Sequence, residues 1–286
     1  MSAFADPATV FRGELVFAAP HMDDEVLACG GTIASLPDKK RIHVVYATDG
    51  SRSPVPAFDW IGAASADLPT IRRAEANSAL DVLGIPEQNR QFLDFPDGEL
   101  QQNVSDVQHA LARLLERVRP SHVFVPFRFD RHPDHVALHA ATIRASRSLS
   151  RPIQLVEYFV YYRWRLLPGG DIRKIIQPDH LVRIDITGQS QQKQRALECY
   201  VSQATCFFSW QDRPILPATR VVEVSRSPEL FLMHHPDYPG TAVFSRLRHW
   251  IPLAHRLEPC LKQWKDKVRL LARAGRARSS PPAMTS

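Results

Sequence analysis

The sequence predicts an α/β fold: a Rossmann-like, mostly parallel sheet with helices on both faces, followed by a basic helical extension at the C-terminus. Apolar runs alternate with helix-like stretches along the chain, as in βαβ units. The runs are nearly continuous rather than alternating, which is typical of strands buried on both faces. Polar clusters follow four successive runs, where ligands bind in such sheets. With 286 residues, the chain can form one large domain with an appendage.

The elements follow in order. The apolar runs predict five strands, at Glu14–Ala18, Ile42–Thr48, Arg90–Asp94, His122–Phe127 and Leu155–Val160. Helical spacing predicts four helices between them, at Asp24–Leu36, Pro69–Leu83, Val104–Val118 and Asp134–Ser148. Between the second strand and the second helix, Ser51–Leu68 reads as a long loop beside the presumed site.

Beyond residue 160 the pattern is weaker. We expect a strand at Leu181–Ile186, a helix at Gln189–Tyr200 and another short strand at Arg220–Val224. The predicted domain covers residues 1–245, and residues 246–286 form the basic extension. Within it, Pro259–Arg273 has apolar residues at helical spacing with Lys and Arg between them.

The excess of basic residues behind the net charge of +6 lies in this extension. From Arg246 onward there are ten Lys or Arg and two acids, which leaves 26 basic and 28 acidic residues in the body. The body therefore need not bind a polyanion. No nucleic-acid motif accompanies the basic residues. The extension is either a helix packed on the domain or a peripheral helix on the inner membrane surface.

The chain has no apolar run long enough for a membrane span and no secretory signal pattern. Its four cysteines form no CxxC pair and suggest no disulfide framework. We therefore expect a cytoplasmic protein. The sequence does not indicate an oligomeric state.

The segment Ala19–Glu25 places one histidine and three carboxylates directly after the first strand. Read alone, these acids would be a solvated helix N-terminus. A second segment, His132-Pro133-Asp134-His135, follows the fourth strand and opens a helix. Read alone, it would be an ordinary helix start. Because both follow strands at the same sheet edge, we expect them to form one site.

His21, Asp24 and His135 together give two imidazoles and one carboxylate. Three protein ligands leave a position open for water, as in catalytic rather than structural zinc sites. The same set also suits ferrous iron. The first strand turn lacks GxGxxG, and Gly30-Gly31 lies too far into the helix for a phosphate loop.

At these residues the chain resembles the LmbE-like (PIG-L type) family of zinc-dependent N-acetylglucosaminyl deacetylases. The family pattern [AP]HPDDE stands here as PHMDDE, with Met22 in place of the usual proline, and HPDH is intact. Other matching stretches are TDGSRS, IRRAEANSALDVLGI, FLDFPDGEL and KQRALECYVSQ. They appear in the expected order from about Glu14 to Gln203. The replacement of proline removes no ligand and no proton donor, so we expect activity to survive it.

The resemblance implies that His21, Asp24 and His135 bind zinc and that Asp23 is the catalytic base. It also implies that His132 assists at the scissile carbonyl or the leaving amine. In this hypothesis zinc-bound water attacks an acetamide carbonyl, Asp23 takes its proton, and protonated His132 helps to stabilise the oxyanion. Either Asp23 or His132 then protonates the amine.

Three further residues have weaker assignments. Asp134 is expected to orient His132 or a ligand ring. Arg72 is a candidate for holding a substrate hydroxyl or phosphate, against the alternative of a surface or capping arginine. Asp97 is a candidate for accepting sugar hydroxyls, against a plain turn residue. Aromatic residues that could stack on a sugar or belong to the core are Tyr158, Tyr161, Tyr162, Trp164 and Trp210.

The predicted function is hydrolysis of an N-acetyl group on an amino sugar or its conjugate, a small-molecule or glycoconjugate substrate. Two alternatives remain open. One is hydrolysis of a different amide, such as an acylated glycoside metabolite or a thiol conjugate. The other is a non-enzymatic binding module on the same fold.

Overall fold

The structure is a computed structural model that describes residues 3–54, 67–162 and 171–234. Several predictions fall outside these ranges: most of the Ser51–Leu68 loop, Trp164, the domain boundary at residue 245, and the basic extension with its helix at Pro259–Arg273. Among the described residues, no helix combines the length and the apolar character that a membrane span requires.

The centre of the described chain is a seven-stranded sheet with the order β3-β2-β1-β4-β5-β7-β6. The first five strands are mutually parallel, as predicted, and β7 runs antiparallel to both of its neighbours. The strands are β1 (Leu15–Ala19), β2 (Ile42–Thr48), β3 (Arg90–Phe95), β4 (His122–Pro126), β5 (Gln154–Tyr158), β6 (Leu181–Ile184) and β7 (Glu229–Met233).

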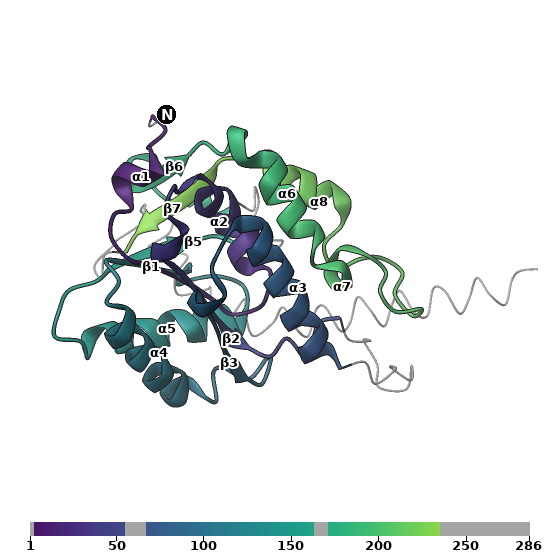
Figure 1. Ribbon diagram of the computed structural model, residues 1–286, viewed down its shortest axis with the longest axis horizontal. Helices are drawn as coiled ribbons and strands as arrows, with labels where there is room; N and C mark the ends of the chain where they lie inside the picture. The colour runs from purple at the N-terminus through teal and green to yellow at the C-terminus, as the bar shows by residue number, and fades with distance from the viewer. Residues whose placement is uncertain (1–2, 55–66, 163–170, 235–286) are drawn as a thin grey trace, which may run out of the picture.

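Helices cover both faces of this sheet, which confirms the predicted architecture (Figure 1). One face carries α2 (Asp24–Ser35), α3 (Leu68–Leu83), α6 (Ser190–Glu198) and α8 (Ala218–Arg226). The other carries α4 (Val104–Val118) and α5 (Pro133–Arg147). Two short helices, α1 (Pro7–Val10) and α7 (Val201–Ala204), complete the described set.

The burial of the central strand β1 shows why helices must cover both faces of the sheet. All five of its residues are buried. Because side chains alternate along a strand, Leu15 and Phe17 enter the core beneath α2 and α3, while Val16 and Ala18 enter the core beneath α4 and α5. Burying an apolar side chain of this size stabilises a fold by about 1.5–3 kcal/mol.

The strand predicted at Arg220–Val224 is wrong, because these residues lie in α8. Pro217 precedes the helix, and the buried residues Val221, Val224 and Ser225 follow helical spacing. The β-branched valines favour a strand locally, but this buried face packs in the core shared with α6, and tertiary packing outweighs that preference. Strand β7 had no counterpart among the predictions.

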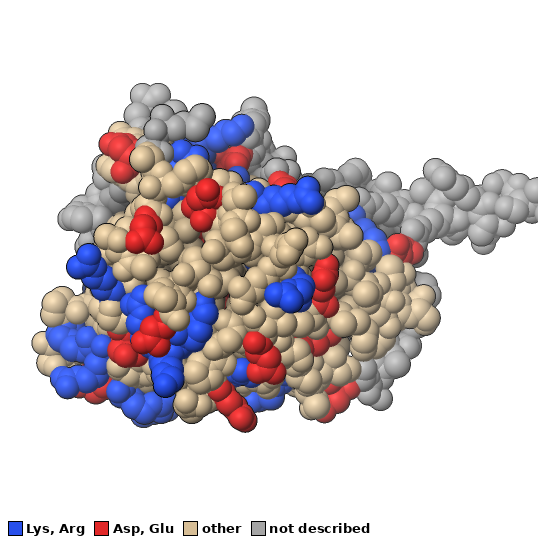
Figure 2. Space-filling view, turned by 45° about the horizontal axis from the view of Figure 1, so that its top comes forward, with Lys and Arg blue, Asp and Glu red and all other residues tan. Residues whose placement is uncertain are grey.

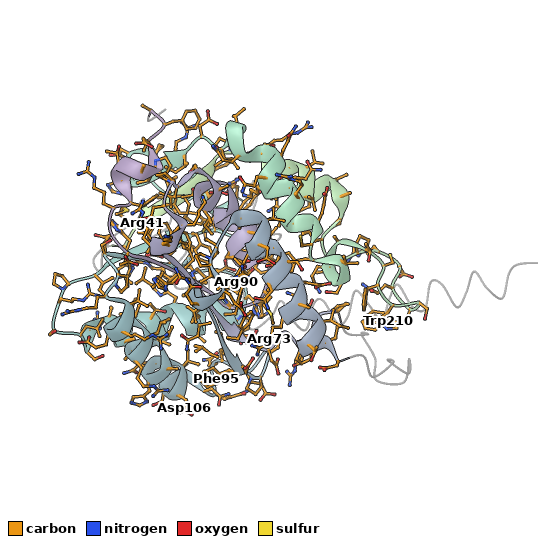
Figure 3. All side chains as sticks on the ribbon, viewed as in Figure 1. Arg41, Arg73, Arg90, Phe95, Asp106 and Trp210 are labelled. Carbon is orange, nitrogen blue, oxygen red and sulfur yellow. The ribbon has the colours of Figure 1, made fainter. Side chains whose placement is uncertain are left out.

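Both signs of charge are mixed over the face that Figure 2 shows, with acidic side chains among the basic ones. Ion pairs and hydrogen bonds also join elements: Arg73 pairs with Asp94, and Arg90 donates to Asp81 at 2.5 Å, so both arginines tie α3 to the β3 region (Figure 3). The described body is therefore not a uniformly basic surface, in agreement with the charge distribution along the sequence.

Candidate active site

The site lies at the carboxyl edge of the sheet, where the loops after β1, β2, β3 and β4 meet. In the order β3-β2-β1-β4, the chain adds strands on one side of β1 and then crosses to the other. Ligands bind at such a switch point in open α/β sheets. The loops are joined directly: the amide of Asp97 donates to Asp49 at 3.2 Å, and the amide of Gly98 donates to Asp134 at 2.8 Å.

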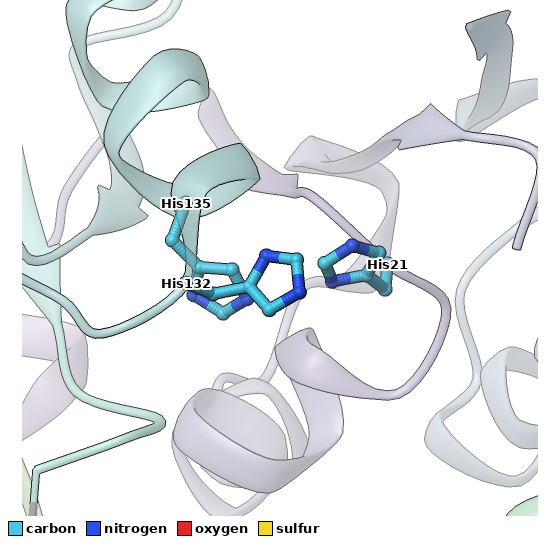
Figure 4. A group of neighbouring side chains, drawn as sticks. All are labelled: His21, His132 and His135. Atoms are coloured by element: carbon cyan, nitrogen blue, oxygen red, sulfur yellow. The ribbon is translucent and has the colours of Figure 1, made fainter. Parts of the chain in front are cut away.

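Three histidines converge at this edge. His21 comes from the turn after β1, and His132 and His135 come from the start of α5 (Figure 4). The ring centroid of His21 lies 4.7 Å from that of His132 and 5.3 Å from that of His135. One nitrogen from each ring falls within 4.8 Å of the others. The structure thus brings together the two segments that the sequence placed 111 residues apart.

Asp24 stands between two of these rings. Its Oδ2 is 3.2 Å from His21 Nδ1 and 3.2 Å from His135 Nε2. Burial alone would raise the pKa of Asp24, but His135 and His21 hold it well below its usual value. An ionised carboxylate and two ring nitrogens therefore face a common point.

An outer carboxylate lies beside each of the two rings. His21 Nε2 lies 3.1 Å from Asp134 Oδ2, and His135 Nδ1 lies 3.4 Å from Asp130 Oδ2. Each ring thus turns its other nitrogen toward Asp24. Such contacts set the tautomer and orientation of metal-binding histidines.

Asp134 lies where its predicted orienting role requires, and the ring that it contacts is that of His21. Asp130 was not predicted. Its position two residues before His132 in DRHPDH was the available signal.

These residues fit a divalent metal ion. Both ring nitrogens of His135 are buried without a hydrogen bond of good geometry among the described residues. Buried polar atoms of this kind are costly unless a ligand satisfies them. The donors are imidazole nitrogens and a carboxylate oxygen, which suit zinc and ferrous iron.

A second group of three donors, His139, Glu157 and His234, lies farther along α5 and β5. Here Arg128 already bonds the carboxylate: its Nε lies 3.0 Å from Glu157 Oε1 and 3.2 Å from Oε2. The guanidinium neutralises the group, so a metal cation would meet repulsion there.

Asp23, the expected base, is the N-cap of α2 with a φ of 138°. Its side chain is 14% exposed, and its Oδ2 lies 3.7 Å from Arg72 Nη2. Burial raises the pKa of Asp23 to about 7, although the positive charge of Arg72 opposes the shift. A carboxylate with this pKa can exchange a proton near neutral pH.

His132 caps α5. Its Nδ1 accepts a hydrogen bond from the amide of Asp134 at 3.3 Å, so we assign the proton to Nε2 and the ring as neutral. Burial, with the charges of His21 and His135, lowers the pKa of His132 to about 3. This does not support the expected protonated His132. A neutral ring still offers an Nε2–H donor.

Arg72 and Asp97 both lie at the site, but in buried positions. Arg72 is 1% exposed and donates to the carbonyl of Met22, beneath Asp23. Asp97 is 5% exposed, accepts from the amide of Arg52, and lies 3.2 Å from His21 Nε2. Their contacts in the structure are with the turn after β1 and with the loop after β2, and the predicted contacts with a substrate remain predictions.

Of the aromatic candidates, Tyr158 belongs to the core and donates to the carbonyl of Ala18. Tyr161 instead lies beside the site, 44% exposed, with its ring centroid 5.3 Å from that of His135. It is therefore a better placed candidate for contact with a substrate.

Comparison with known proteins gives a family match over the part of the chain that contains this site. The model of the PIG-L family, described as GlcNAc-PI de-N-acetylase, matches residues 16–146. A 1D-myo-inositol 2-acetamido-2-deoxy-alpha-D-glucopyranoside deacetylase of Rhodococcus erythropolis is 25% identical over 246 residues, which cover 69% of this chain and 83% of that protein. All the proposed metal and proton-transfer residues lie within the range that the family model matches.

Two solved structures share the fold. The N,N'-diacetylchitobiose deacetylase of Pyrococcus horikoshii is 20% identical with a TM-score of 0.59, over 80% of this chain and 85% of that one. The 4-carboxy-2-hydroxymuconate hydratase GalB of Pseudomonas putida is 20% identical with a TM-score of 0.52, over 75% and 83%. The fold alone therefore does not decide the reaction. Residues 16–146 of this chain thus match the PIG-L family, and the site described above lies within them.

Proposed function

We propose that the protein is a zinc-dependent hydrolase that removes an N-acetyl group from an amino sugar or a sugar conjugate. The observation that carries the proposal is the position of Asp24 between His21 and His135, with Asp23 adjacent to it in the same turn. The R. erythropolis relative is named as a deacetylase of an acetamido sugar linked to inositol, which supports the substrate class.

In the proposed site, His21, Asp24 and His135 hold the metal. Asp134 and Asp130 keep the two rings oriented. When bound, zinc would polarise the amide carbonyl and lower the pKa of a coordinated water to about 7. Zinc is preferred to ferrous iron because hydrolysis needs no change of oxidation state.

The proton transfers fall to this chain's own residues. Asp23, with its pKa of about 7, accepts a proton from the attacking water and passes it to the leaving amine. His132 donates its Nε2–H to the carbonyl oxygen as negative charge develops there. Its N-cap bond to the amide of Asp134 holds the ring in that tautomer.

Two residues are proposed for substrate contact. Asp97 would accept sugar hydroxyls from the edge of the site, and Arg72 would meet a polar substituent next to Asp23. Since both are buried, these contacts require the substrate to reach past Asp23 and His21.

The test is acetate release from a panel of free, nucleotide-linked and lipid-linked N-acetyl sugars, with other acylated glycosides and thiol conjugates included. Asp23→Asn should lower kcat by about 100-fold or more with zinc still bound, because general-base catalysis contributes about 10²–10⁴-fold. Asp67→Asn, which changes the N-cap of α3 instead, should retain activity. Full activity of zinc-loaded Asp23→Asn would exclude Asp23 as the base. Lack of acetate release from every N-acetyl sugar would overturn the proposed function.

A further inference from the structure

The backbone at Asp23 is held in an unfavourable conformation. Asp23 has φ 138° and ψ −23°, on the side of conformational space that glycine occupies and other residues rarely adopt. Backbone strain of this kind costs about 1–3 kcal/mol and persists only where the surroundings enforce it. The conformation places the proposed base next to its metal-binding neighbour Asp24, so what enforces it matters for catalysis.

Both polar ends of this one peptide group are bonded to buried charged side chains. The carbonyl of Met22 accepts a hydrogen bond from Arg72 Nη2. The amide of Asp23 donates to Glu25 Oε2 at 3.2 Å. Arg72 and Glu25 are each 1% exposed, so water competes little for these bonds. Together the two side chains clamp the peptide group from opposite ends.

Tyr200 contacts both side chains of this clamp, Glu25 and Arg72. Its hydroxyl donates to Glu25 Oε1 at 2.6 Å, and Tyr46 donates to the same oxygen at 2.7 Å. With Oε1 engaged by two hydroxyls, Oε2 is left facing the amide of Asp23. The ring of Tyr200 also lies under the guanidinium of Arg72, with Cζ 6.0 Å from the ring centroid.

The clamp accounts for two features of the sequence that the metal chemistry leaves aside. Glu25 completes the acidic run but contacts neither His21 nor His135 in the structure, since its oxygens serve Asp23, Tyr46 and Tyr200. Met22 replaces a rigid proline, yet it is 1% exposed and packs in the core. The turn is thus held by bonds to the peptide group that do not require a proline ring.

We propose that Tyr200, acting through Glu25 and Arg72, is a positioning residue that holds the Met22–Asp23 peptide and so aims the Asp23 carboxylate. This rests on the proposed function of Asp23 as the base. Tyr200 lies after α6, in the stretch KQRALECYVSQ, and beyond residue 146, where the match to the family model ends. The C-terminal part of the described chain would therefore complete a catalytic turn that belongs to the N-terminal part.

Tyr200→Phe tests the proposal, with Tyr158→Phe as its matched control. Both tyrosines are buried to within 1%, and each donates one hydroxyl hydrogen bond, but Tyr158 donates to the carbonyl of Ala18. We expect Tyr200→Phe to lower kcat by about 10-fold, with KM and zinc content near those of the wild type. Tyr158→Phe should lose a similar amount of thermal stability and keep its kcat. Equal kcat values for the two zinc-loaded variants would overturn the proposal.

A second measurement does not depend on catalysis. Amide hydrogen exchange at Asp23, followed by NMR, should be about 10-fold faster in Tyr200→Phe than in Tyr158→Phe, because the bond to Glu25 weakens. Unchanged exchange would refute the clamp whether or not the enzyme is a deacetylase. Selective exchange in a protein inactive on every substrate would uphold the clamp and reject the proposed function. If Tyr200→Phe does not fold, Tyr46→Phe replaces it, because this variant removes the other hydroxyl that bonds Glu25. Its kcat and its amide exchange at Asp23 are then measured in the same way.

Discussion

Single residues carry most of the information about the site. His21, Asp24 and His135 could be selected from the sequence because imidazole and carboxylate groups after strands of one sheet are natural metal ligands. Arg72 shows the limit of this reasoning. An arginine on a helix near a site is expected to face solvent or substrate, but here it is 1% exposed and bonded to the carbonyl of Met22, in the turn after β1. Residue type determines which interactions a side chain can make, and burial determines which partners lie within its reach.

His135→Gln and His139→Gln distinguish the proposed metal site from the group formed by His139, Glu157 and His234. Both histidines are buried and one turn apart on α5. We expect His135→Gln to lose bound zinc and activity together, because it removes a ligand, and His139→Gln to keep one zinc per chain. Zinc content after dialysis, measured by atomic absorption, checks both. Stoichiometric, tightly held zinc in His135→Gln would show that His135 is not a ligand.

At the scale of elements, helix α2 depends on the chain that packs against it. Lys193 of α6 donates to the carbonyl of Leu27 at 2.9 Å and pairs with Glu229 of β7 at 2.7 Å. Glu229 in turn accepts hydrogen bonds from the amides of Gly31 and Thr32. Gly30, which belongs to the pair unsuited to a phosphate loop, permits the close approach of Lys193, because an added Cβ would lie 3.2 Å from Lys193 Cγ. Gly31 permits the close approach of Ile186.

Gly31→Ala should destabilise the fold by about 1–3 kcal/mol, despite the better helix propensity of alanine. A Cβ at Gly31 would lie 2.5 Å from Ile186 Cγ2 and 2.6 Å from Ile186 Cβ, which is too near the backbone to swing aside. Gly188→Ala is the control, because nothing lies within 4 Å of its added Cβ. Urea denaturation measures both, and equal midpoints would contradict the packing described for α2.

At the scale of the whole molecule, buried charges join segments that are distant in sequence. Glu157 of β5 accepts the amide of Arg128 from the loop after β4 at 2.9 Å, and lies 2.8 Å from His234 Nδ1 after β7. Burial would raise its pKa, but the nearby His139 ring, with hydrogen bonds from His234 and Arg128, holds the pKa of Glu157 well below its usual value. Its ionised form therefore stabilises the native arrangement of these segments.

This shift predicts how stability changes with pH. Because the folded-state pKa lies below the unfolded value of about 4.3, ionised Glu157 stabilises the fold above that pH, and the contribution is lost as the pH falls toward the folded-state pKa. Glu157→Gln should cost about 3 kcal/mol at pH 7 and progressively less below pH 4. Glu99→Gln, whose exposed carboxylate pairs with Arg52, should cost under about 1 kcal/mol. Denaturant titrations of both variants, from pH 7 to below pH 4, measure these losses of stability. A loss for Glu157→Gln that does not change with pH would refute the prediction.

The sequence by itself determined the first five strands, the helices between them and the two segments that form the site. These features are local: continuous apolar runs, helical spacing and ligand-type residues at strand ends. Beyond residue 160, local pattern predicted β6 and α6 correctly. It was insufficient for α8, whose valines favour a strand, and for β7, which pairs antiparallel at the far side of the sheet. Tertiary structure alone decided that Asp130 lies beside His135, that Arg72 is buried, and that Tyr200 lies behind the Met22–Asp23 peptide. The physical reason is that each residue's type sets its chemistry, whereas burial and the pairing of distant charges exist only once the chain has packed.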